Sequence, residues 1–374
     1  MKIAIDCRGI NWYHGTGIGT YTDNLLKNLL KIDDENYYHL FWSGLGYEKY
    51  EKHNANFIMS SEKHHRFFQQ HIFPNNIENE KIDIYHVPQN GIGLSNNIDC
   101  IKFVTVHDLI PYVMPETVGK GYLNKFLKEM PYIIENSDGI LTVSEFSKKD
   151  ILRFFPVDEN KIFVTPLAAN KIFKPLNPLY CKNYIKEKYN ITNKFAIYVG
   201  GFSDRKNVHS LIEAFSKAYK NLDEKFNLLI IGSYRDPNQK LVRLAESLGM
   251  GEKIIFTGFI PEEELPIFYN SASVFIYPSF YEGFGLPPLE AMSCGTPVIS
   301  SNLSSIPEVV KGNGILINPH IKKDLEYSIE NVLNNKNLRE SLRKKSLEGS
   351  KEFSWKNTAE LTLESYNKIY NKMI

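Results

Sequence analysis

Residues 274–299 indicate the fold class, and they read Val-Phe-Ile-Tyr-Pro-Ser-Phe-Tyr-Glu-Gly-Phe-Gly-Leu-Pro-Pro-Leu-Glu-Ala-Met-Ser-Cys-Gly-Thr-Pro-Val-Ile. The first four residues form an apolar run, which predicts a buried strand at 274–277. A glycine-rich turn follows, and prolines stand at 287–288, where the first turn of a helix tolerates them. Gly295 supplies the glycine that commonly ends a helix, and a second apolar run comes directly after it. The stretch therefore predicts a strand, a short helix and another strand.

Apolar runs of strand length recur along the chain, and helical patterns follow most of them. The runs are 2–5, 38–42, 84–87, 103–106 and 140–143 in the first half, and 195–199, 227–231, 253–257, 274–277, 297–300 and 315–317 in the second. The helical stretches include 18–30, 208–219 and 287–293. Because strands and helices alternate and the runs are continuously apolar, we predict an α/β fold with parallel sheets covered on both faces by helices.

The segment 165–178 predicts a division into two domains, because it contains three prolines and no strong period. We expect an N-terminal Rossmann-like domain at 1–175 on the acceptor side, completed by a C-terminal helix at 358–374. A second Rossmann-like domain, at 176–357, is expected to bind the donor. In open α/β sheets ligands bind beyond the carboxyl ends of the strands, so the two domains are expected to face each other across a cleft.

The composition argues against several classes of protein. The 374 residues include 44 Lys+Arg and 43 Asp+Glu, and a net charge of +1 argues against a nucleic-acid binder. The four cysteines lie far apart in the sequence, which argues against a disulfide framework and a zinc site. The first residues lack the apolar run of a secretion signal, and nowhere do roughly 18 apolar residues run together. We therefore expect a soluble, cytoplasmic protein.

The loop at 14–20, His-Gly-Thr-Gly-Ile-Gly-Thr, precedes a predicted helix. Glycines let the backbone approach a ligand closely, and a helix N-terminus offers free N–H groups to an anion. Counted from Gly15, the third glycine position of the spacing G-x-G-x-x-G is Thr20, so the loop is not a dinucleotide fingerprint. An NAD enzyme is therefore disfavoured, and a ligand-binding loop and a plain tight turn both remain open.

A second glycine-containing loop, Gly-Gly-Phe-Ser-Asp-Arg-Lys-Asn at 200–207, follows the run at 195–199. Arg205 and Lys206 precede a predicted helix, whose N-terminus favours anions and not cations. The arrangement becomes favourable once a phosphate or diphosphate binds, because Arg clamps it bidentately and Lys adds a point charge. The alternative is a solvated surface pair.

Two glutamates, Glu282 and Glu290, belong to the turn and helix that follow the strand at 274–277. We expect both near the strand ends, where the backbone N–H groups of residues 283–286 can hold a diphosphate or a sugar hydroxyl. A carboxylate on a helix, such as that of Glu290, suits bidentate bonding to a ribose diol. The alternative for Glu290 is complementarity to the helix dipole.

These glutamates, with seven residues between them, resemble the E-x7-E signature of retaining GT-B glycosyltransferases of family four. Other motifs appear in the family's order: Gly-Ile-Gly at 17–19, Thr-Val-His-Asp at 105–108, Thr-Val-Ser-Glu-Phe-Ser at 142–147 and Gly-Gly-…-Arg-Lys-Asn at 200–207. The resemblance covers nearly the whole chain. It is closest to bacterial mannosyltransferase-like enzymes of polysaccharide and O-antigen assembly, and it implies the GT-B fold.

The resemblance implies a role for each matching residue. Arg205 and Lys206 match the pair that neutralises the departing diphosphate, and Glu290 matches the carboxylate that binds the ribose. Glu282 and His107 match residues at the donor sugar, with His107 contributed by the N-terminal domain. The remaining donor-binding positions are loop glycines, backbone amides and a residue near the base: Gly17, Gly19, Gly201, Phe259, Gly283, Phe284, Gly285 and Leu286.

The resemblance also implies a mechanism without a metal or any other cofactor. Two cations and helix N–H groups can stabilise the charge that develops on the leaving diphosphate, and the sequence has no Asp-x-Asp motif to hold a metal. The implied reaction is a same-face displacement, in which the leaving phosphate takes the proton of the acceptor. Glu282 is not assigned as a nucleophile.

The sequence thus predicts a retaining hexosyltransferase that moves mannose from GDP-mannose to a growing glycan or a lipid-linked oligosaccharide in cell-surface polysaccharide synthesis. A UDP- or dTDP-sugar of glucose, galactose or rhamnose is the alternative donor. A sugar-nucleotide epimerase would not need the pattern at 282–290, and an inactive nucleotide-sugar binder is the non-enzyme alternative. The sequence gives no signal for an oligomeric state.

Two further segments carry weaker signals. His64, His65 and His71 allow a metal site to be imagined, but no carboxylate or cysteine joins them within 63–71, so a helix that packs Phe67 and Phe68 inward is favoured. The stretch 121–130 mixes lysines with aromatic and aliphatic residues, and could contact an anionic inner membrane surface near a lipid-linked acceptor. A plain amphipathic core helix is favoured there.

Overall fold

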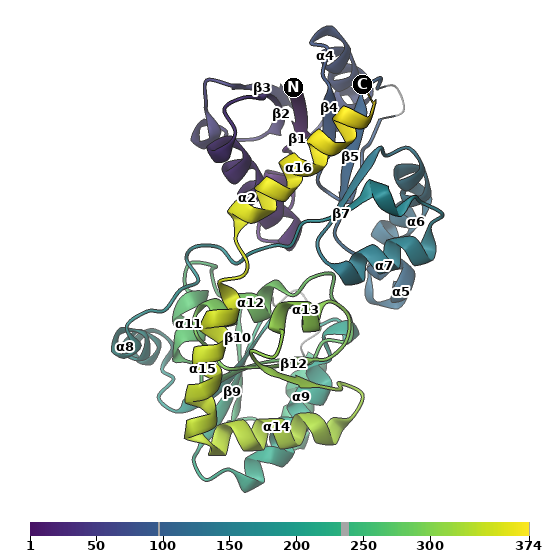
Figure 1. Cartoon of the computed structure of the whole chain (residues 1–374). Helices are drawn as coiled ribbons and strands as arrows, with labels where there is room; N and C mark the ends of the chain where they lie inside the picture. Colours follow the sequence, from purple (N-terminus) through teal and green to yellow (C-terminus); the bar gives the residue numbers. More distant parts are fainter. Residues whose placement is uncertain (96–97, 233–238, 374) are drawn as a thin grey trace. The chain divides into compact units, whose positions relative to one another are not determined.

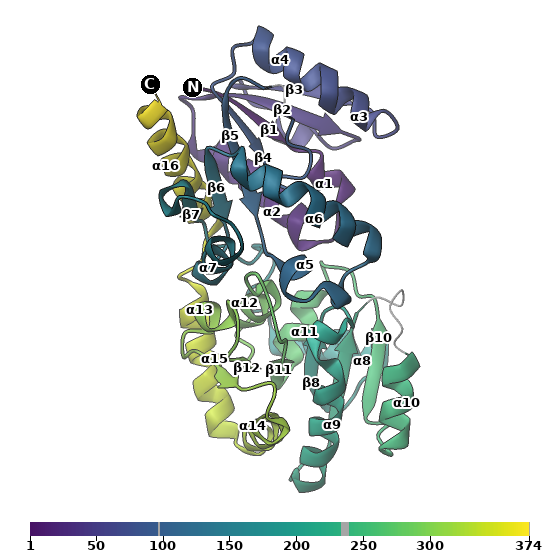
Figure 2. The same cartoon turned by 90° about the vertical axis from the view of Figure 1, so that its right-hand side faces the viewer.

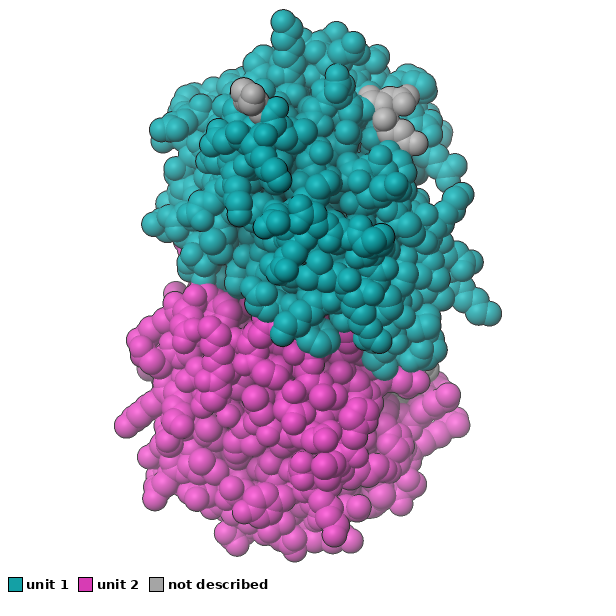
Figure 3. All heavy atoms as spheres, turned by 45° about the vertical axis from the view of Figure 1, so that its right-hand side comes forward, with its two compact units in different colours: residues 1–168, 354–374 teal, residues 169–353 magenta. Residues whose placement is uncertain are grey.

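The computed structural model describes residues 1–95, 98–232 and 239–373, and the chain divides into two compact units. Unit 1 comprises residues 1–168 and 354–374, and unit 2 comprises residues 169–353 (Figure 3). The expected domain boundaries, 175/176 and 357/358, lie a few residues after these divisions. Each unit has its own parallel sheet and its own apolar core, which confirms the predicted α/β class with two Rossmann-like domains.

In the described residues, the sheet of unit 1 has the strand order β3-β2-β1-β4-β5-β6-β7, and its neighbours pair in parallel. The strands are β1 Lys2–Asp6, β2 Tyr37–Ser43, β3 Ala55–Ser60, β4 Ile84–Val87, β5 Ile101–Val106, β6 Gly139–Thr142 and β7 Ile162–Val164. The inner strands are almost fully buried, so their apolar runs are visible in the sequence. The runs do not predict β3 and β7, which are edge strands with half-exposed residues.

Helices cover both faces of this sheet (Figures 1 and 2). They are α1 Gly9–Trp12, α2 Gly17–Ile32, α3 His65–Phe67, α4 Phe73–Asn79, α5 Ile110–Val113, α6 Lys120–Glu135, α7 Glu145–Phe154 and α16 Trp355–Met373. On one face, α4 and α6 pack Phe73 and Phe126 into a core that includes Val104 of β5. On the opposite face, α16 packs against α2 and places Tyr366 against Phe103 of β5.

In the described residues, the sheet of unit 2 has the order β10-β9-β8-β11-β12-β13 and is parallel throughout. Its strands are β8 Lys194–Val199, β9 Phe226–Ile231, β10 Ile254–Gly258, β11 Val274–Tyr277, β12 Val298–Ser301 and β13 Ile315–Ile317. The helices are α8 Pro178–Tyr189, α9 Val208–Ala218, α10 Gln239–Ser247, α11 Leu265–Ser271, α12 Leu286–Ser293, α13 Ile306–Val310, α14 Lys322–Asn334 and α15 Lys336–Ser350. Each apolar run of the second half overlaps one of these strands.

The strand order reverses once in each sheet. The chain builds outward from β8 to β10 on one side and from β11 to β13 on the other, so the reversal lies between β8 and β11. In unit 1 it lies between β1 and β4. Loops diverge beyond the carboxyl ends of the strands at such a point, and open α/β sheets bind their ligands there.

The segment at 63–71 differs from the predicted helix. The three-residue helix α3 is followed by a π-helical turn at Phe68–Ile72. Phe68 packs against the core, but the side chain of Phe67 is 55% exposed. The expected inward packing is therefore wrong for Phe67, because adjacent helical residues point about 100° apart and cannot share one buried face.

Helix α6 is the amphipathic core helix that the sequence favours. It buries Phe126, Met130 and Ile133, whereas Leu127 is 39% exposed and Tyr122, one turn before Phe126, is 40% exposed. Among the described residues, the helices are all too short or too polar to cross a membrane.

Candidate active site

The strand reversal of unit 2 brings together two loops that the sequence separates by some seventy residues. The loop after β8 contains a 3-10 turn at Asp204–Lys206, and the loop after the neighbouring strand β11 contains Glu282. Phe280 N donates to Arg205 O over 2.8 Å, and Asn207 Nδ2 donates to Pro278 O over 3.2 Å. One backbone hydrogen bond and one bond from the Asn207 side chain therefore join the two loops.

Glu282 is the centre of this site. Its Oε1 lies 2.9 Å from Arg205 Nη1 and 2.7 Å from Lys206 Nζ, and accepts a hydrogen bond from Tyr277 OH over 3.1 Å. Ser279 Oγ donates a fourth hydrogen bond to the same oxygen. Burial alone would raise the pKa of Glu282, but Lys206 and Arg205 outweigh burial and lower that pKa to about 2. The carboxylate is thus ionised, and its Oε1 is occupied by four donors.

The two cations are fixed by further contacts. Arg205 Nη1 also donates to Tyr281 O over 2.6 Å, and Lys206 Nζ hydrogen-bonds Tyr277 OH and lies 4.9 Å from the centre of its ring. Arg205, Lys206 and Glu282 together carry a net charge of +1. A site at which two fixed cations face one carboxylate attracts an anion, and their guanidinium and ammonium groups suit phosphate oxygens.

The turn between Glu282 and α12 is buried, and hydrogen bonds hold its backbone in place. Ser305 Oγ donates to Glu282 O and to Phe284 O, over 2.8 and 2.7 Å, and the ring of Phe284 packs edge-on against Phe353. Gly285 has φ 120°, and a Cβ there would lie 2.8 Å from Ile306 Cδ1. The predicted cradle of Gly283, Phe284, Gly285 and Leu286 leads into the start of α12, and its role in binding stays a prediction.

Glu290 lies on α12, apart from the charged cluster. Tyr269 OH of α11 donates to Glu290 Oε2 over 3.1 Å. Burial raises the pKa of Glu290 to about 7, although the hydrogen bond from Tyr269 opposes the shift, and Glu262 adds to it by repulsion. A carboxylate with a pKa near neutrality gains its full capacity to accept hydrogen bonds only when it is deprotonated.

Two predicted residues of unit 2, Gly201 and Phe259, lie outside this cluster. Tyr198 OH donates to Gly201 O over 2.6 Å, which fixes the loop directly after β8. Gly200 has φ 155°, and a Cβ there would meet Tyr198 OH at 2.8 Å, so this backbone requires glycine. Phe259 follows β10 and its side chain is 69% exposed, which leaves an aromatic face available for stacking.

His107 is at the end of β5 in unit 1 and is held from two sides. Its Nε2 donates to Pro88 O over 2.9 Å, and its backbone N donates to Asn90 Oδ1 over 2.8 Å. The Tyr21 ring packs against the imidazole with an interplanar angle of 85°. Burial lowers the pKa of His107 to about 4, so the ring is neutral near pH 7. With its proton on Nε2, it presents Nδ1 as a hydrogen-bond acceptor.

Gly17 and Gly19 form the first turn of α2 in unit 1. Thr16 caps the helix, since its Oγ1 accepts a hydrogen bond from Gly19 N over 3.4 Å. A Cβ on Gly19 would lie 2.3 Å from Tyr13 O, so close packing requires glycine at this position. Gly17 is exposed at the helix N-terminus. The structure thus explains Gly19 by packing and leaves Gly17 accessible to a ligand.

The structure brings Arg205, Lys206 and Glu282 into one cluster, with Glu290 on the adjoining helix, and it assigns His107, Gly17 and Gly19 to unit 1. Sequence reasoning missed three side chains that support the site: Tyr269, Tyr277 and Ser279. Tyr277 ends an apolar strand and so resembles a core residue in the sequence. The proximity of Ser279 to Glu282 in the turn is the one signal that could have marked it.

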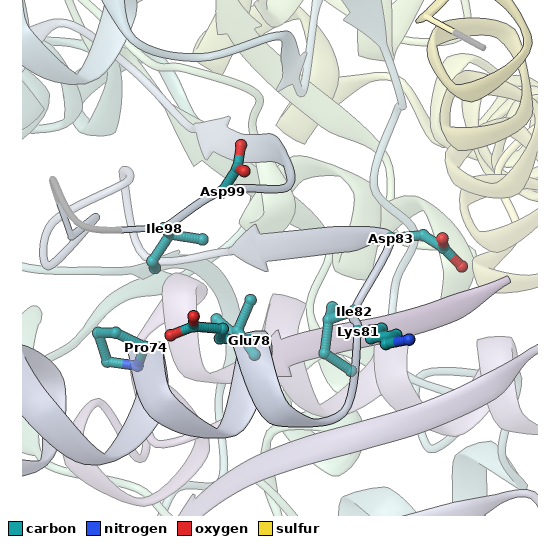
Figure 4. Close-up of a pocket in the computed structure, with 8 residues that line it drawn as sticks. Pro74, Glu78, Lys81, Ile82, Asp83, Ile98 and Asp99 are labelled. Atoms are coloured by element: carbon teal, nitrogen blue, oxygen red, sulfur yellow. The ribbon is translucent and has the colours of Figure 1, made fainter.

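The cavity in Figure 4 lies in unit 1 and contains none of the predicted residues. It has a volume of about 630 Å³ and is lined by residues at the end of α4 and around the start of β4, including Glu78, Asp83 and Asp99. Asp83 Oδ2 already accepts a hydrogen bond from Lys2 N over 2.7 Å. Within the described ranges, no group of three or more His, Cys, Asp or Glu side chains is arranged to hold a metal ion.

Comparison with known proteins identifies the family. The family described as Glycosyltransferase Family 4 matches residues 15–170, and the family described as Glycosyl transferases group 1 matches residues 182–348. The O-antigen chain mannosyltransferase B of Escherichia coli is 33% identical over 283 residues, which cover 76% of this chain and 74% of that protein. This chain therefore belongs to the family 4 glycosyltransferases, as its motifs predict.

Other similar proteins agree with this family. The serotype-specific mannosyltransferase WbdA of Escherichia coli is 30% identical over 283 residues, which are 74% of this chain but only 34% of WbdA. This chain thus spans about a third of that relative's length. Among solved structures, the sucrose-phosphate synthase of Thermosynechococcus elongatus matches with a TM-score of 0.77 and 20% identity over 100% of both chains. Anabaena Alr3699/HepE, solved in complex with UDP-glucose, matches with a TM-score of 0.73 and 16% identity over 98% of this chain and 100% of that one. These likenesses confirm the predicted GT-B fold.

Proposed function

We propose that this glycosyltransferase moves mannose from GDP-mannose, with retention of anomeric configuration, to a growing glycan or a lipid-linked oligosaccharide in cell-surface polysaccharide synthesis. The names of the Escherichia coli relatives support mannose as the sugar and an O-antigen type of acceptor. The observation that carries the proposal is the cluster of Arg205, Lys206 and Glu282 at the strand reversal of unit 2, because a nucleotide-sugar needs a cationic site for its diphosphate.

Arg205 and Lys206 take the role of stabilising the leaving group. The bond between the anomeric carbon and the diphosphate oxygen breaks, and negative charge develops on that oxygen. Two cations held within 3 Å of a carboxylate oxygen can transfer their contacts to the diphosphate and stabilise this charge without a metal ion. A bond from the acceptor oxygen forms on the same face, and the acceptor proton passes to the departing phosphate.

Glu282 is a poor candidate for a nucleophile in this mechanism. Four donors occupy one of its oxygens, and its pKa of about 2 makes it a weak base. Its role in the proposal is to orient Arg205 and Lys206 and to meet hydroxyl groups of the donor sugar. His107, neutral with Nδ1 as an acceptor, would accept a hydrogen bond from a donor-sugar hydroxyl.

The nucleoside is assigned to the remaining side chains of unit 2. Glu290 would accept hydrogen bonds from the two ribose hydroxyls, and Phe259 would stack on the base. Neither contact distinguishes guanine from uracil or thymine. A UDP-sugar is the second candidate donor, and the complex of Alr3699/HepE with UDP-glucose is the observation that favours it.

The proposed acceptor places the enzyme at the cytoplasmic face of the membrane. Helix α6 supports this location, because Tyr122 and Leu127 are exposed on it beside the exposed Lys125 and Lys128. Aromatic and aliphatic groups next to lysines suit the interface of an anionic bilayer.

Thermal unfolding in the presence of GDP-mannose, UDP-glucose and dTDP-rhamnose, without added metal, tests the donor. A ligand at 100 times its Kd stabilises the folded state by about 2.7 kcal/mol, so the true donor should give the largest rise in Tm. Arg205→Ala should abolish that rise. A larger rise with UDP-glucose would replace the sugar, and no rise with any donor would refute the assigned donor site. NMR of the product then tests retention, since an inverted anomeric linkage would contradict it.

A further inference from the structure

A buried chain of hydrogen bonds crosses the sheet of unit 1 beneath α2 and α16. Tyr366 OH lies 2.7 Å from His86 Nδ1, His86 Nε2 lies 2.8 Å from Thr105 Oγ1, and Thr105 Oγ1 lies 3.0 Å from Tyr21 OH. All four side chains are fully buried. These hydrogen bonds therefore link the C-terminal helix to α2 through strands β4 and β5, and water does not reach them.

The neutral His86 ring has one donor and one acceptor nitrogen, so its two hydrogen bonds run in the same direction. When Thr105 likewise gives one bond and receives one, donation runs from Tyr366 OH through His86 and Thr105 to Tyr21 OH, or the reverse way along the same atoms. In both directions His86 and Thr105 each give one hydrogen bond and receive one, which makes this series of bonds self-consistent.

This series of hydrogen bonds ends beside His107. The Tyr21 and His107 rings meet edge to face, with centroids 4.7 Å apart, and the ring of Trp355, at the start of α16, lies 6.2 Å from that of Tyr21. Among the residues that the structure describes, the His107 ring makes one hydrogen bond, from Nε2 to Pro88 O, and a single bond does not fix the plane of the ring. The contact with Tyr21 supplies the second constraint.

We propose that Tyr21 is the positioning residue of His107, and that Tyr366 holds Tyr21 in place through His86 and Thr105. Neither tyrosine touches the substrate. The C-terminal helix α16 then contributes to the geometry of the histidine that meets the donor sugar. This inference rests on the proposed function for its catalytic consequence, because the position of His107 affects the rate only if His107 contacts the donor.

NMR of the histidine rings in the full chain tests the positioning without any reaction. The His107 signal is identified by its loss in His107→Ala. Tyr21→Leu and Tyr366→Phe are expected to shift that signal, the first through a lost ring current and the second through a displaced Tyr21. The matched control is Tyr38→Phe, which removes another buried hydroxyl, bonded to Asp33, and should leave His107 unshifted. An unchanged His107 signal in both test variants would overturn the inference.

A double-mutant cycle on sugar transfer tests the consequence. Tyr21→Leu should lower kcat about tenfold with little change in the KM of the donor, and Tyr21→Phe, which keeps the ring but loses the hydrogen bond to Thr105, should lower kcat less than Tyr21→Leu does. In the His107→Ala background Tyr21→Leu should lower kcat no further. An equal loss in both backgrounds would indicate general destabilisation and overturn the inference. If His107→Ala matches the wild type, the role of His107 in the proposed function fails, while the NMR shifts still decide whether Tyr21 positions the ring.

Discussion

The contribution of Glu282 depends more on its charge than on its shape, because one of its oxygens contacts two cations and accepts hydrogen bonds from two hydroxyls. Glu282→Gln keeps the shape and leaves Arg205 and Lys206 facing a neutral amide. We expect the free energy of unfolding of unit 2 to fall by about 1–3 kcal/mol, the usual result of leaving buried groups unsatisfied. GDP should restore part of this loss, because its diphosphate replaces the missing charge. Thermal unfolding with and without GDP measures both effects.

Ser279→Ala is the matched control for this prediction, since it removes a neutral donor from the same oxygen and leaves the charges in place. Its loss of stability should be smaller, and GDP should stabilise it no more than it stabilises the wild type. A smaller GDP-dependent rise in Tm for Glu282→Gln than for the wild type would mean that the diphosphate does not bind at Arg205 and Lys206.

Glu290 should make nucleotide binding dependent on pH. Its pKa is raised from 4.5 to about 7, chiefly by burial, so between these values the folded chain holds a proton that the unfolded chain has released. The stabilising contribution of this proton is complete below pH 4.5 and is lost as the pH rises through 7. Ribose hydroxyls donate to the ionised carboxylate, so nucleotide affinity should rise over the same interval and level off above it.

Calorimetric titration of GDP below, at and above pH 7 measures this dependence. Glu290→Gln should bind GDP more weakly and with a flat pH profile over that range, because an amide does not ionise. Tyr269→Phe removes the hydrogen bond that opposes the pKa shift, so its affinity should begin to rise at a higher pH than in the wild type. The same slope in Glu290→Gln and the wild type would assign the dependence to another group.

The sequence could indicate which side chains gather at the proposed donor site but not how they meet. Arg205, Lys206 and Glu282 stand in recognisable motifs, and the chemistry of a diphosphate explains each motif separately. Their convergence depends on β8 and β11 being neighbours at the strand reversal, which follows from the tertiary strand order. Tyr277 could not be recognised, because a tyrosine that ends an apolar strand has the sequence pattern of a core residue.

The turn before α12 gives a prediction about backbone conformation. Gly285→Ala places a side chain at φ 120° and against Ile306, whereas Gly312→Ala meets the same kind of strain at φ 76° with open space around its Cβ. We expect about 1 kcal/mol of destabilisation for Gly312→Ala and up to about 3 kcal/mol for Gly285→Ala. Only Gly285→Ala should also weaken nucleotide binding. Denaturant unfolding and GDP titration of both variants separate the two effects, and equal binding by both would exclude the turn from the donor site.

Helix α6 gives a prediction about the membrane. Lys125→Glu combined with Lys128→Glu should abolish sedimentation with vesicles rich in anionic lipid, because each juxtamembrane lysine adds about 1 kcal/mol of attraction. Leu127→Ser should weaken the binding without changing its charge. A matched reversal on α15, Lys344→Glu with Lys345→Glu, should leave vesicle binding intact. Equal binding by the wild type and the α6 variants would remove α6 from any membrane contact.

How well an element can be predicted depends on how completely it is buried. The inner strands β4, β5 and β6 are buried along their lengths, so their apolar runs stand out in the sequence. The edge strands β3 and β7 contain half-exposed residues, and no pattern separates them from loops. The series of hydrogen bonds through Tyr21, His86 and Tyr366 is harder still to predict, because each residue has the pattern of a core residue in its own segment. His86 and Tyr366 are 280 positions apart in the sequence.

The two units should report ligand binding separately, because each has its own sheet and core. Arg205, Lys206, Glu282 and Glu290 all belong to unit 2. We therefore expect two calorimetric transitions, of which GDP raises only the one assigned to unit 2. Tyr366→Ala leaves a cavity in the core of unit 1 and should lower the free energy of unfolding of that unit by about 3–5 kcal/mol, as large aromatic truncations do. Only the transition of unit 1 should then move to a lower temperature. Differential scanning calorimetry of the full chain measures both.

Arg205→Ala provides the control for this assignment, because it should remove the GDP-dependent rise while leaving the transition of unit 1 where it was. A GDP-dependent rise in the transition that Tyr366→Ala lowers would mean that unit 1 contributes to nucleotide affinity, and the donor site would then have to include residues such as Gly17. If GDP acts only on unit 2, the affinity for nucleotide resides there, which agrees with the proposal that His107 and the hydrogen bonds that end at Tyr21 act on the sugar and the rate.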